Sequence, residues 1–161
     1  MIKPLDGITI VAIEHYVAGP FGTMLLADFG ADVIRVERPG TGEAMRVPQV
    51  SAKDGQVLPL VYLINNRNKR SLTLDLKTPE GQKILRDLLK TADVLYENLA
   101  PEALARMDLT FDVLQELNPQ LIYLSVSGFG RPDLDRGPLT DRPALDFIAQ
   151  AMSGLMNGPN L

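Results

Sequence analysis

The chain has 161 residues, 45% of them hydrophobic and 22% charged, which is typical of a globular protein with a sizeable core. The net charge of −4 gives no electrostatic reason to expect nucleic acid or an anionic membrane as a partner. With no cysteine and a single histidine, His15, disulfides, zinc clusters and thiol nucleophiles are excluded, and we expect no metal site. The sequence shows no signal peptide and no membrane-spanning apolar run, so we expect a cytoplasmic protein.

The N-terminal part of the chain predicts two buried strands joined by a helix. Residues 8–13 are apolar and β-branched without polar alternation, as in a parallel strand covered on both faces. A helix is expected from about Pro20, and Gly30 suits the left-handed residue that ends it. Residues 32–37 predict the second strand. This part of the chain therefore forms a strand, helix and strand unit.

The rest of the chain repeats this alternation. Residues 71–76 alternate as a strand, after which Thr78 and Pro79 predict the start of a helix with a buried leucine stripe. The further expected elements are strands at 92–98 and 121–127, short helices at 101–107 and 110–118, and a last helix at 145–156. Strands that alternate with helices predict a doubly wound, mostly parallel α/β sheet with helices on both faces.

Ligands of such sheets bind beyond the carboxyl ends of the strands, so the loops there are the candidate site. The first loop leads to Gly19 and Gly22 but has no G-x-G-x-x-G pattern. Pro20 also lacks the backbone N–H that would donate a hydrogen bond to a pyrophosphate, which disfavours NAD as the ligand. Glu37, however, follows Gly19 at nearly the spacing of a ribose-binding acid. NAD or another adenosine ligand therefore stays open as an alternative.

Basic residues near these loops are candidate phosphate ligands. Arg38 directly follows the second strand, where its guanidinium could bind a phosphate or lie over an adenine, and a solvated arginine is an equal alternative. The cluster of Arg67, Lys69 and Arg70 is more typical of a solvated turn than of a phosphate site. Arg106 has no stronger support by itself.

Three other polar residues have simple structural explanations. His15 lacks a partner pattern that would mark it as a base or metal ligand, which favours a hydrogen bond within its loop. Asp146 lies in the first turn expected for the last helix, where the helix dipole favours any acid. Ser127 is not the nucleophile of a serine hydrolase, because Ser125 stands where that motif needs glycine.

Six ordered blocks carry a resemblance to a known family. They read KPLDGITIVAIEHYVAGP, LADFGADVIRVERPGTGE, NRNKRSLTLDLKTPEG, ADVLYENLAPEALARM, LNPQLIYLSVSGFG and LDFIAQAMSG. Over nearly its whole length the chain resembles the N-terminal part of family III CoA-transferases, the formyl-CoA transferase and carnitine CoA-transferase group. The resemblance implies one Rossmann-like region over residues 1–161 that binds coenzyme A (CoA). CoA and acyl-CoA would be substrates, and no tightly bound cofactor is expected.

The resemblance also implies where CoA would be contacted. Carried over position by position, the contacts come from five segments: His15, Val17 and Ala18; Arg38; Leu74, Asp75 and Lys77; Asn98 and Leu99; and Arg106 and Met107. Val17 stands where some members have glutamine, so a polar contact to the acyl group is missing and the acyl substrate stays open.

The implied chemistry is covalent catalysis by a carboxylate. In the family an aspartate attacks the acyl-CoA thioester and releases the CoA thiolate, with anhydride and enzyme–CoA thioester intermediates. That aspartate lies in a GD motif beyond the last block, so we expect it beyond residue 161 and expect this piece alone to be inactive. Asp146 matches an acidic position that supports the nucleophile. The related α-methylacyl-CoA racemases carry histidine where Leu145 stands, which disfavours a racemase.

The leading hypothesis is an enzyme that moves CoA between an acyl-CoA and a small carboxylic acid, with a dicarboxylic acid as one option. The alternatives are a catalytically incompetent CoA or adenine-nucleotide binding module and an α/β interaction domain without a ligand. The resemblance further implies an interlaced homodimer, of which this chain would be an incomplete part with exposed apolar surface.

Overall fold

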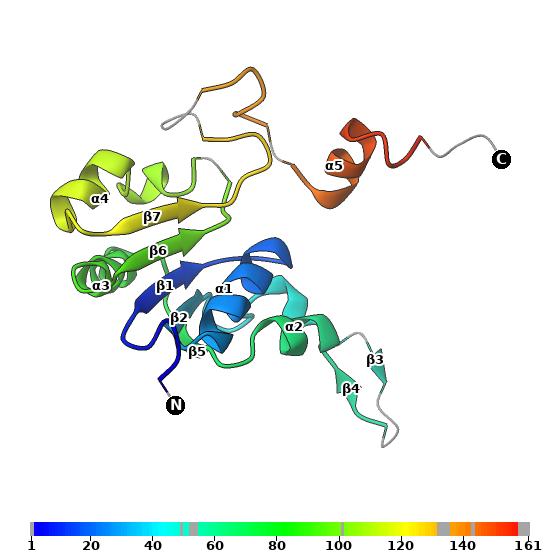
Figure 1. Cartoon of the computed structure of the whole chain (residues 1–161), viewed down its shortest axis with the longest axis horizontal. Helices are drawn as coiled ribbons and strands as arrows, with labels where there is room; N and C mark the ends of the chain where they lie inside the picture. Colours follow the sequence, from blue (N-terminus) through cyan, green and yellow to red (C-terminus); the bar gives the residue numbers. More distant parts are fainter. Residues whose placement is uncertain are drawn as a thin grey trace.

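A five-stranded sheet forms the centre of the computed structural model, which describes residues 2–48, 50–51, 55–100, 102–131, 136–142 and 144–157. Its strands lie in the order β5-β2-β1-β6-β7, and every neighbouring pair is parallel (Figure 1). Their bounds are β1 Thr9–Ile13, β2 Asp32–Glu37, β5 Arg70–Thr73, β6 Val94–Glu97 and β7 Ile122–Ser125. The predicted parallel sheet is confirmed. The short strands β3 (Val50–Ser51) and β4 (Val57–Leu58) form a separate antiparallel pair.

Helices cover both faces of this sheet. Helices α1 (Ala18–Asp28) and α2 (Leu60–Asn65) lie on one face, and α3 (Pro79–Leu89) and α4 (Phe111–Leu117) lie on the other. Two 3-10 turns, η1 (Ala44–Arg46) and η2 (Ala105–Met107), follow β2 and β6. This arrangement is the doubly wound architecture that the alternation of elements predicts.

Strand β1 is the centre of two hydrophobic cores. Val11 and Ile13 point to the core that contains Leu85 of α3, whereas Ile10 and Ala12 point to the core on the α1 side. Successive side chains of a strand point to opposite faces, so a strand covered on both sides needs apolar residues at every position. This double burial explains why residues 8–13 show no polar alternation.

The predicted helix signals act as expected. The side-chain oxygen of Thr78 accepts a hydrogen bond from the N–H of Gly81 at 3.1 Å, and Pro79 is the first residue of α3. Gly30 follows α1 with φ 108°, a conformation that a side chain would make costly. The start of α3 and the end of α1 are therefore set by local chemistry.

Several predicted boundaries are wrong. The strand expected at 71–76 ends at Thr73, because the chain turns into the cap of α3. The helix expected at 101–107 is only the turn η2, and Pro101 lies outside the described residues. The last helix, α5 (Asp146–Met152), ends early because Gly154 has φ 84°.

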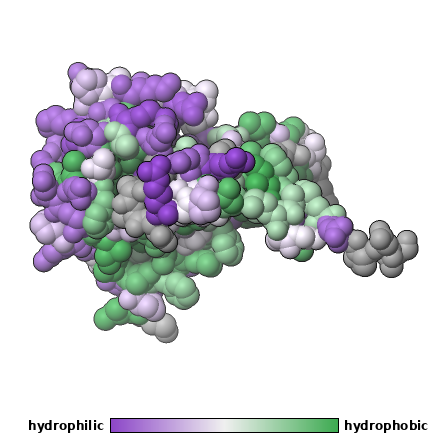
Figure 2. Space-filling view, turned by 90° about the horizontal axis from the view of Figure 1, so that it is seen from above, coloured by the Kyte–Doolittle hydropathy of each residue, from purple (hydrophilic) through white to green (hydrophobic). Residues whose placement is uncertain are grey.

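Helix α5 stands away from the sheet on an arm near the end of the chain (Figure 1). It contains no buried residue, and apolar residues gather on this arm (Figure 2). Within the described residues, no helix has both the length and the apolar character needed to cross a membrane.

Candidate functional site

The loops after β1 and β6 meet where the strand order reverses, since β2 lies beside β1 and β7 beside β6. Such a switch point is the usual ligand-binding position of an open α/β sheet. Asn98 holds both backbone groups of His15 there: its Oδ1 accepts from the His15 N–H at 2.7 Å, and its Nδ2 donates to the His15 carbonyl at 2.9 Å. The structure therefore brings these two predicted residues together, and Asn98 orients the first loop.

Gly19 and Gly22 lie in α1, directly after the first loop, and they serve packing rather than a phosphate-binding turn. A Cβ added at Gly19 would lie 2.8 Å from Asn98 Cγ, and one at Gly22 would collide with the Tyr96 hydroxyl. Both contacts come from β6 or the loop after it, so the glycines allow this strand to approach α1 closely. This explains glycines that do not follow the dinucleotide fingerprint.

Arg38 borders two adjoining cavities beyond the carboxyl ends of β2 and β5. The smaller, about 220 Å³, is lined by Glu37, Arg38, Gly40, Thr41, Gly42, Arg46, Ser71 and Thr73. The larger, about 480 Å³, shares Arg38, Thr41, Gly42 and Arg46 and adds Glu43, Ala44, Val47 and Pro48. Arg38, Arg46 and several hydroxyls line this open space together with Glu37 and Glu43. Because Arg46 is paired with Glu37, Arg38 is the guanidinium that an anionic ligand would meet.

Both carboxylate oxygens of Glu37 accept hydrogen bonds from other side chains of the protein, which does not favour a role in binding ribose. Arg46 donates to its two oxygens at 2.6 and 2.7 Å, Ser71 at 2.9 Å and Tyr62 at 3.0 Å. Burial alone would raise the pKa of Glu37, but the hydrogen bonds from Arg46 and Ser71 outweigh it and lower the pKa to about 2. The spacing of Glu37 from Gly19 indicates a ribose-binding acid, but the Glu37 carboxylate instead binds Arg46, Ser71 and Tyr62. We call this group of four side chains the Glu37 clasp.

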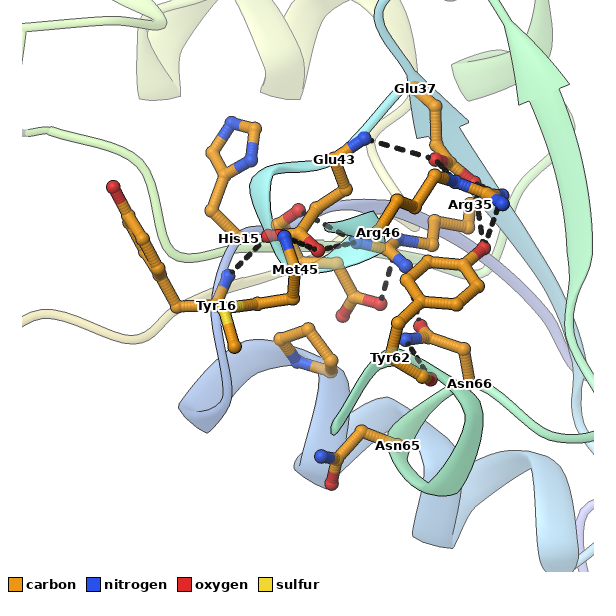
Figure 3. A network of polar contacts seen from close by, with 12 residues as sticks. His15, Tyr16, Arg35, Glu37, Glu43, Met45, Arg46, Tyr62, Asn65 and Asn66 are labelled. Atoms are coloured by element: carbon orange, nitrogen blue, oxygen red, sulfur yellow. Dashed lines mark hydrogen bonds and ion pairs between the residues drawn. The ribbon is translucent and has the colours of Figure 1, made fainter. Parts of the chain in front are cut away.

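A buried charge network behind the cavities was not predicted (Figure 3). Arg35, in the middle of β2, lies between two carboxylates, with Nε 3.6 Å from Glu14 and Nη2 3.7 Å from Glu43. Its Nη1 donates to Asn66 at 2.7 Å, and Lys69 donates to Glu14 at 2.8 Å. Buried charges persist only when they are paired, so these residues form one interdependent unit. The signal available in the sequence was an arginine flanked by apolar residues in the middle of a predicted strand.

The basic residues at the start of β5 are each paired with an acidic side chain. Arg67 pairs with Asp28 at 2.6 Å, and Arg70 pairs with Asp32 at 2.5 Å; both arginines are exposed. Lys69 fits neither predicted alternative, because it is buried in the charge network and burial lowers its pKa while Glu14 opposes that shift.

The other predicted contact residues are spread along the same edge of the sheet. Leu74 is buried, and its N–H donates to the Glu37 carbonyl at 3.0 Å. The Asp75 carboxylate accepts from the Lys77 N–H at 3.0 Å, which shapes the turn after β5. The Leu99 N–H donates to Glu97 at 2.6 Å. The first loop continues into α1 with Val17, which is exposed, and Ala18.

Three predicted residues lie farther along the chain. Arg106 and Met107 form part of η2, where Arg106 is exposed and pairs with Glu102 at 3.4 Å. Asp146 lies on α5, away from the sheet, and accepts a hydrogen bond from Gln150 at 2.6 Å. The structure thus does not bring Asp146 to the cavities beside Arg38.

The imidazole of His15 is partly buried at the mouth of the site. Burial lowers its pKa below the usual 6.5, and the positive charges of Arg35 and Arg38 act in the same direction while Glu43 opposes them. A neutral imidazole offers one donor and one acceptor to a ligand. Among the described residues, no group of three or more histidines and carboxylates is placed to hold a metal ion.

Comparisons with known proteins agree with this architecture. The model of CoA-transferase family III matches residues 5–159. The chain is 44% identical to the succinate–glutarate CoA-transferase of Agrobacterium fabrum over 96% of its own length and 38% of the relative. It is 43% identical to the formyl-CoA:oxalate CoA-transferase of Rhodopseudomonas palustris, over 96% of this chain and 35% of that protein.

Solved structures agree as well. A CAIB/BAIF family protein from Brucella suis superposes with a TM-score of 0.86 and 37% sequence identity, over 99% of this chain and 42% of that one. The chain therefore spans well under half the length of the relatives it matches. Because the family model covers nearly every residue, the chain belongs to CoA-transferase family III.

Proposed function

We propose that this chain forms the CoA-binding region of an enzyme that moves CoA between an acyl-CoA and a small carboxylic acid. The observation that carries the proposal is the family match over residues 5–159. Relatives at 44 and 43% identity are named for transfer between succinate and glutarate and between formyl-CoA and oxalate. These names favour a dicarboxylic acid as acceptor.

The charge and shape of the site support CoA as the ligand. CoA carries phosphates and an adenine, and Arg38 borders cavities that Arg46 and several hydroxyls also line. An arginine can pair with a phosphate through two donors or stack on an adenine. His15 and Asn98, at the switch point, are proposed to contact CoA from the neighbouring loops. The remaining eight positions named by the resemblance are proposed contacts as well: Val17, Ala18, Leu74, Asp75, Lys77, Leu99, Arg106 and Met107.

The chemistry follows from the family resemblance. A carboxylate attacks the thioester carbonyl and the CoA thiolate leaves, which produces an acyl anhydride with the enzyme. The nucleophilic aspartate is proposed to lie beyond residue 161, with Asp146 in support. CoA is then a substrate that comes and goes rather than a resident cofactor. The interlaced homodimer and the cytoplasmic location belong to the same proposal.

Calorimetry with CoA and with NAD tests the binding site. We expect CoA to bind, and Arg38→Ala to weaken it by tenfold or more, because a hydrogen bond to a charged group contributes about 1.5–3 kcal/mol. Arg70→Ala is the matched control, since it removes the same charge at the amino end of β5. Binding of NAD but not CoA, or equal losses in both variants, would contradict the proposal.

A CoA-binding module without catalysis is the second candidate, because Asp146 is remote from the cavities. The two functions differ in a CoA-exchange assay on the whole protein that contains these residues, with a panel of dicarboxylic acids. Exchange between an acyl-CoA and one of these acids supports the transferase. Tight CoA binding with no exchange for any acid supports the binding module.

A further inference from the structure

We propose that Glu43 is a positioning residue that holds the first loop, residues 14–17, in its ligand-binding form. The inference rests on the proposed function, because the first loop matters only if it contacts CoA. It goes beyond that function by assigning a role to a buried carboxylate that is not among the expected CoA contacts. That carboxylate would join the first loop to the second loop, residues 38–43, which lines both cavities.

The two oxygens of Glu43 each accept a different backbone N–H. Oε1 accepts from Tyr16 at 2.8 Å, and Oε2 accepts from Met45 at 2.8 Å (Figure 3). Glu43 is 3% exposed, and Arg35 supplies the compensating positive charge 3.7 Å away. A buried carboxylate with one donor on each oxygen has little freedom to move.

Tyr16 is the residue that needs such a support. The backbone of Tyr16 is left-handed, with φ 61°. Residues other than glycine rarely adopt this conformation, and it persists only when the surroundings enforce it. The Tyr16 side chain is 56% exposed, so its packing does not enforce this conformation. The hydrogen bonds from Asn98 to His15 and from Tyr16 to Glu43 do.

The same residue fixes the second loop. The backbone N–H of Glu43 donates to Glu37 at 3.3 Å, and Glu43 caps the turn η1 that follows. Arg38 lies at the other end of this loop. The Glu43 side chain therefore connects two loops through a contact between residues 27 positions apart. These loops carry three of the proposed CoA contacts: His15, Val17 and Arg38.

The variant Glu43→Gln tests this role, because glutamine has one acceptor oxygen where glutamate has two. We expect the Tyr16 amide to exchange its hydrogen at least tenfold faster by NMR, and CoA affinity to fall about tenfold in calorimetry. The amides of Leu85 and Leu89, in the opposite core, should keep their protection and so report an intact fold. Glu116→Gln, on the exposed surface of α4, is the control and should change neither quantity.

A second variant, Tyr16→Gly, keeps the backbone donor and adopts a left-handed conformation without strain. In this background Glu43→Gln should cost less CoA affinity than in the original chain. Equal losses in both backgrounds, an unchanged Tyr16 exchange rate, or faster exchange with unchanged CoA affinity would each overturn the positioning role. If the original chain fails to bind CoA, the proposed function fails, and the Tyr16 exchange rate still decides whether Glu43 holds the loop.

Discussion

Glu37 shows how one carboxylate can shape a site without touching a ligand. Its two oxygens bind Arg46, Ser71 and Tyr62, and the Arg46 guanidinium also lies 4.0 Å from the Tyr62 ring centroid. This clasp fixes the second loop against β2 and α2, so that Arg38 faces open space. At the residue scale, then, the site depends on charges that are satisfied internally.

The clasp predicts a dependence of stability on pH. Because the pKa of Glu37 is lowered from 4.5 to about 2, its contribution is present above pH 4.5 and is lost as the pH falls toward 2. At about 1.4 kcal/mol per pKa unit, the upper limit of this contribution is about 3 kcal/mol. Urea unfolding at several pH values should show an acid limb that becomes shallower in Glu37→Gln. The exposed control Glu116→Gln should leave that limb unchanged.

His15 offers a direct measurement, since it is the single histidine of the chain. Burial lowers its pKa, so protonation is less favourable in the folded state than in the unfolded state. An NMR titration of the imidazole should therefore give a midpoint below 6.5 when folded and near 6.5 in urea. A folded midpoint above 6.5 would mean that Glu43 dominates over burial.

At the scale of the element, helix starts are decided by a few local contacts. Thr78 caps α3 through Gly81 and also donates to the Asp75 carbonyl at 2.9 Å, which closes the turn after β5. The same hydroxyl thus stabilises the helix and shapes a turn that carries proposed CoA contacts.

Removal of this hydroxyl should destabilise the protein. Loss of a threonine cap typically costs about 1 kcal/mol, so we expect Thr78→Ala to lower the free energy of unfolding by that amount. Thr78→Ser keeps the hydroxyl and should stay within about 0.5 kcal/mol of the original chain. Equal destabilisation by both substitutions, measured by urea unfolding, would show that the methyl group and not the cap matters.

At the scale of the whole molecule, the sheet and the arm that holds α5 differ in burial. The central strands β1, β2 and β6 are mostly buried, although Ile122 on the edge strand β7 is exposed. Large apolar residues of the arm are also exposed: Leu145, Phe147, Met152, Leu155 and Met156. Exposed apolar surface of this kind is expected for a chain that resembles only part of a larger fold. In Figure 2 part of it lies on the arm, and a second apolar area lies on the body of the molecule.

This surface should bind a hydrophobic dye while the sheet unfolds cooperatively. The double variant Phe147→Ser with Leu155→Ser should reduce dye fluorescence at least twofold, because both side chains are exposed. Ile2→Ser removes a single exposed apolar residue at the other end of the chain and should have little effect. Dye binding that is unaffected by the double variant would place the apolar surface elsewhere.

Local patterns were sufficient for the five strands of the sheet and for the family, but they did not predict helix α2 or the short strands β3 and β4. The apolar run at 8–13, the Thr78 cap and Gly30 each act within a few residues, and the structure confirms them. Boundaries were less predictable, because the ends of β5 and α5 depend on how the following turn leaves the element. The resemblance to family III CoA-transferases could also be recognised from the sequence, since it rests on ordered blocks along the chain, and the family match confirms it.

The sequence by itself determined the family and the alternation of the five sheet strands with helices α1, α3 and α4, because periodicity and motifs are local properties. Only the tertiary structure decided which charges meet. Glu14 accepts from Lys69, 55 residues away, and Glu43 accepts from Tyr16, 27 residues away, partners that no spacing rule connects. The physical reason is that a parallel sheet brings the ends of distant strands to one edge, where burial requires each charge to find a partner.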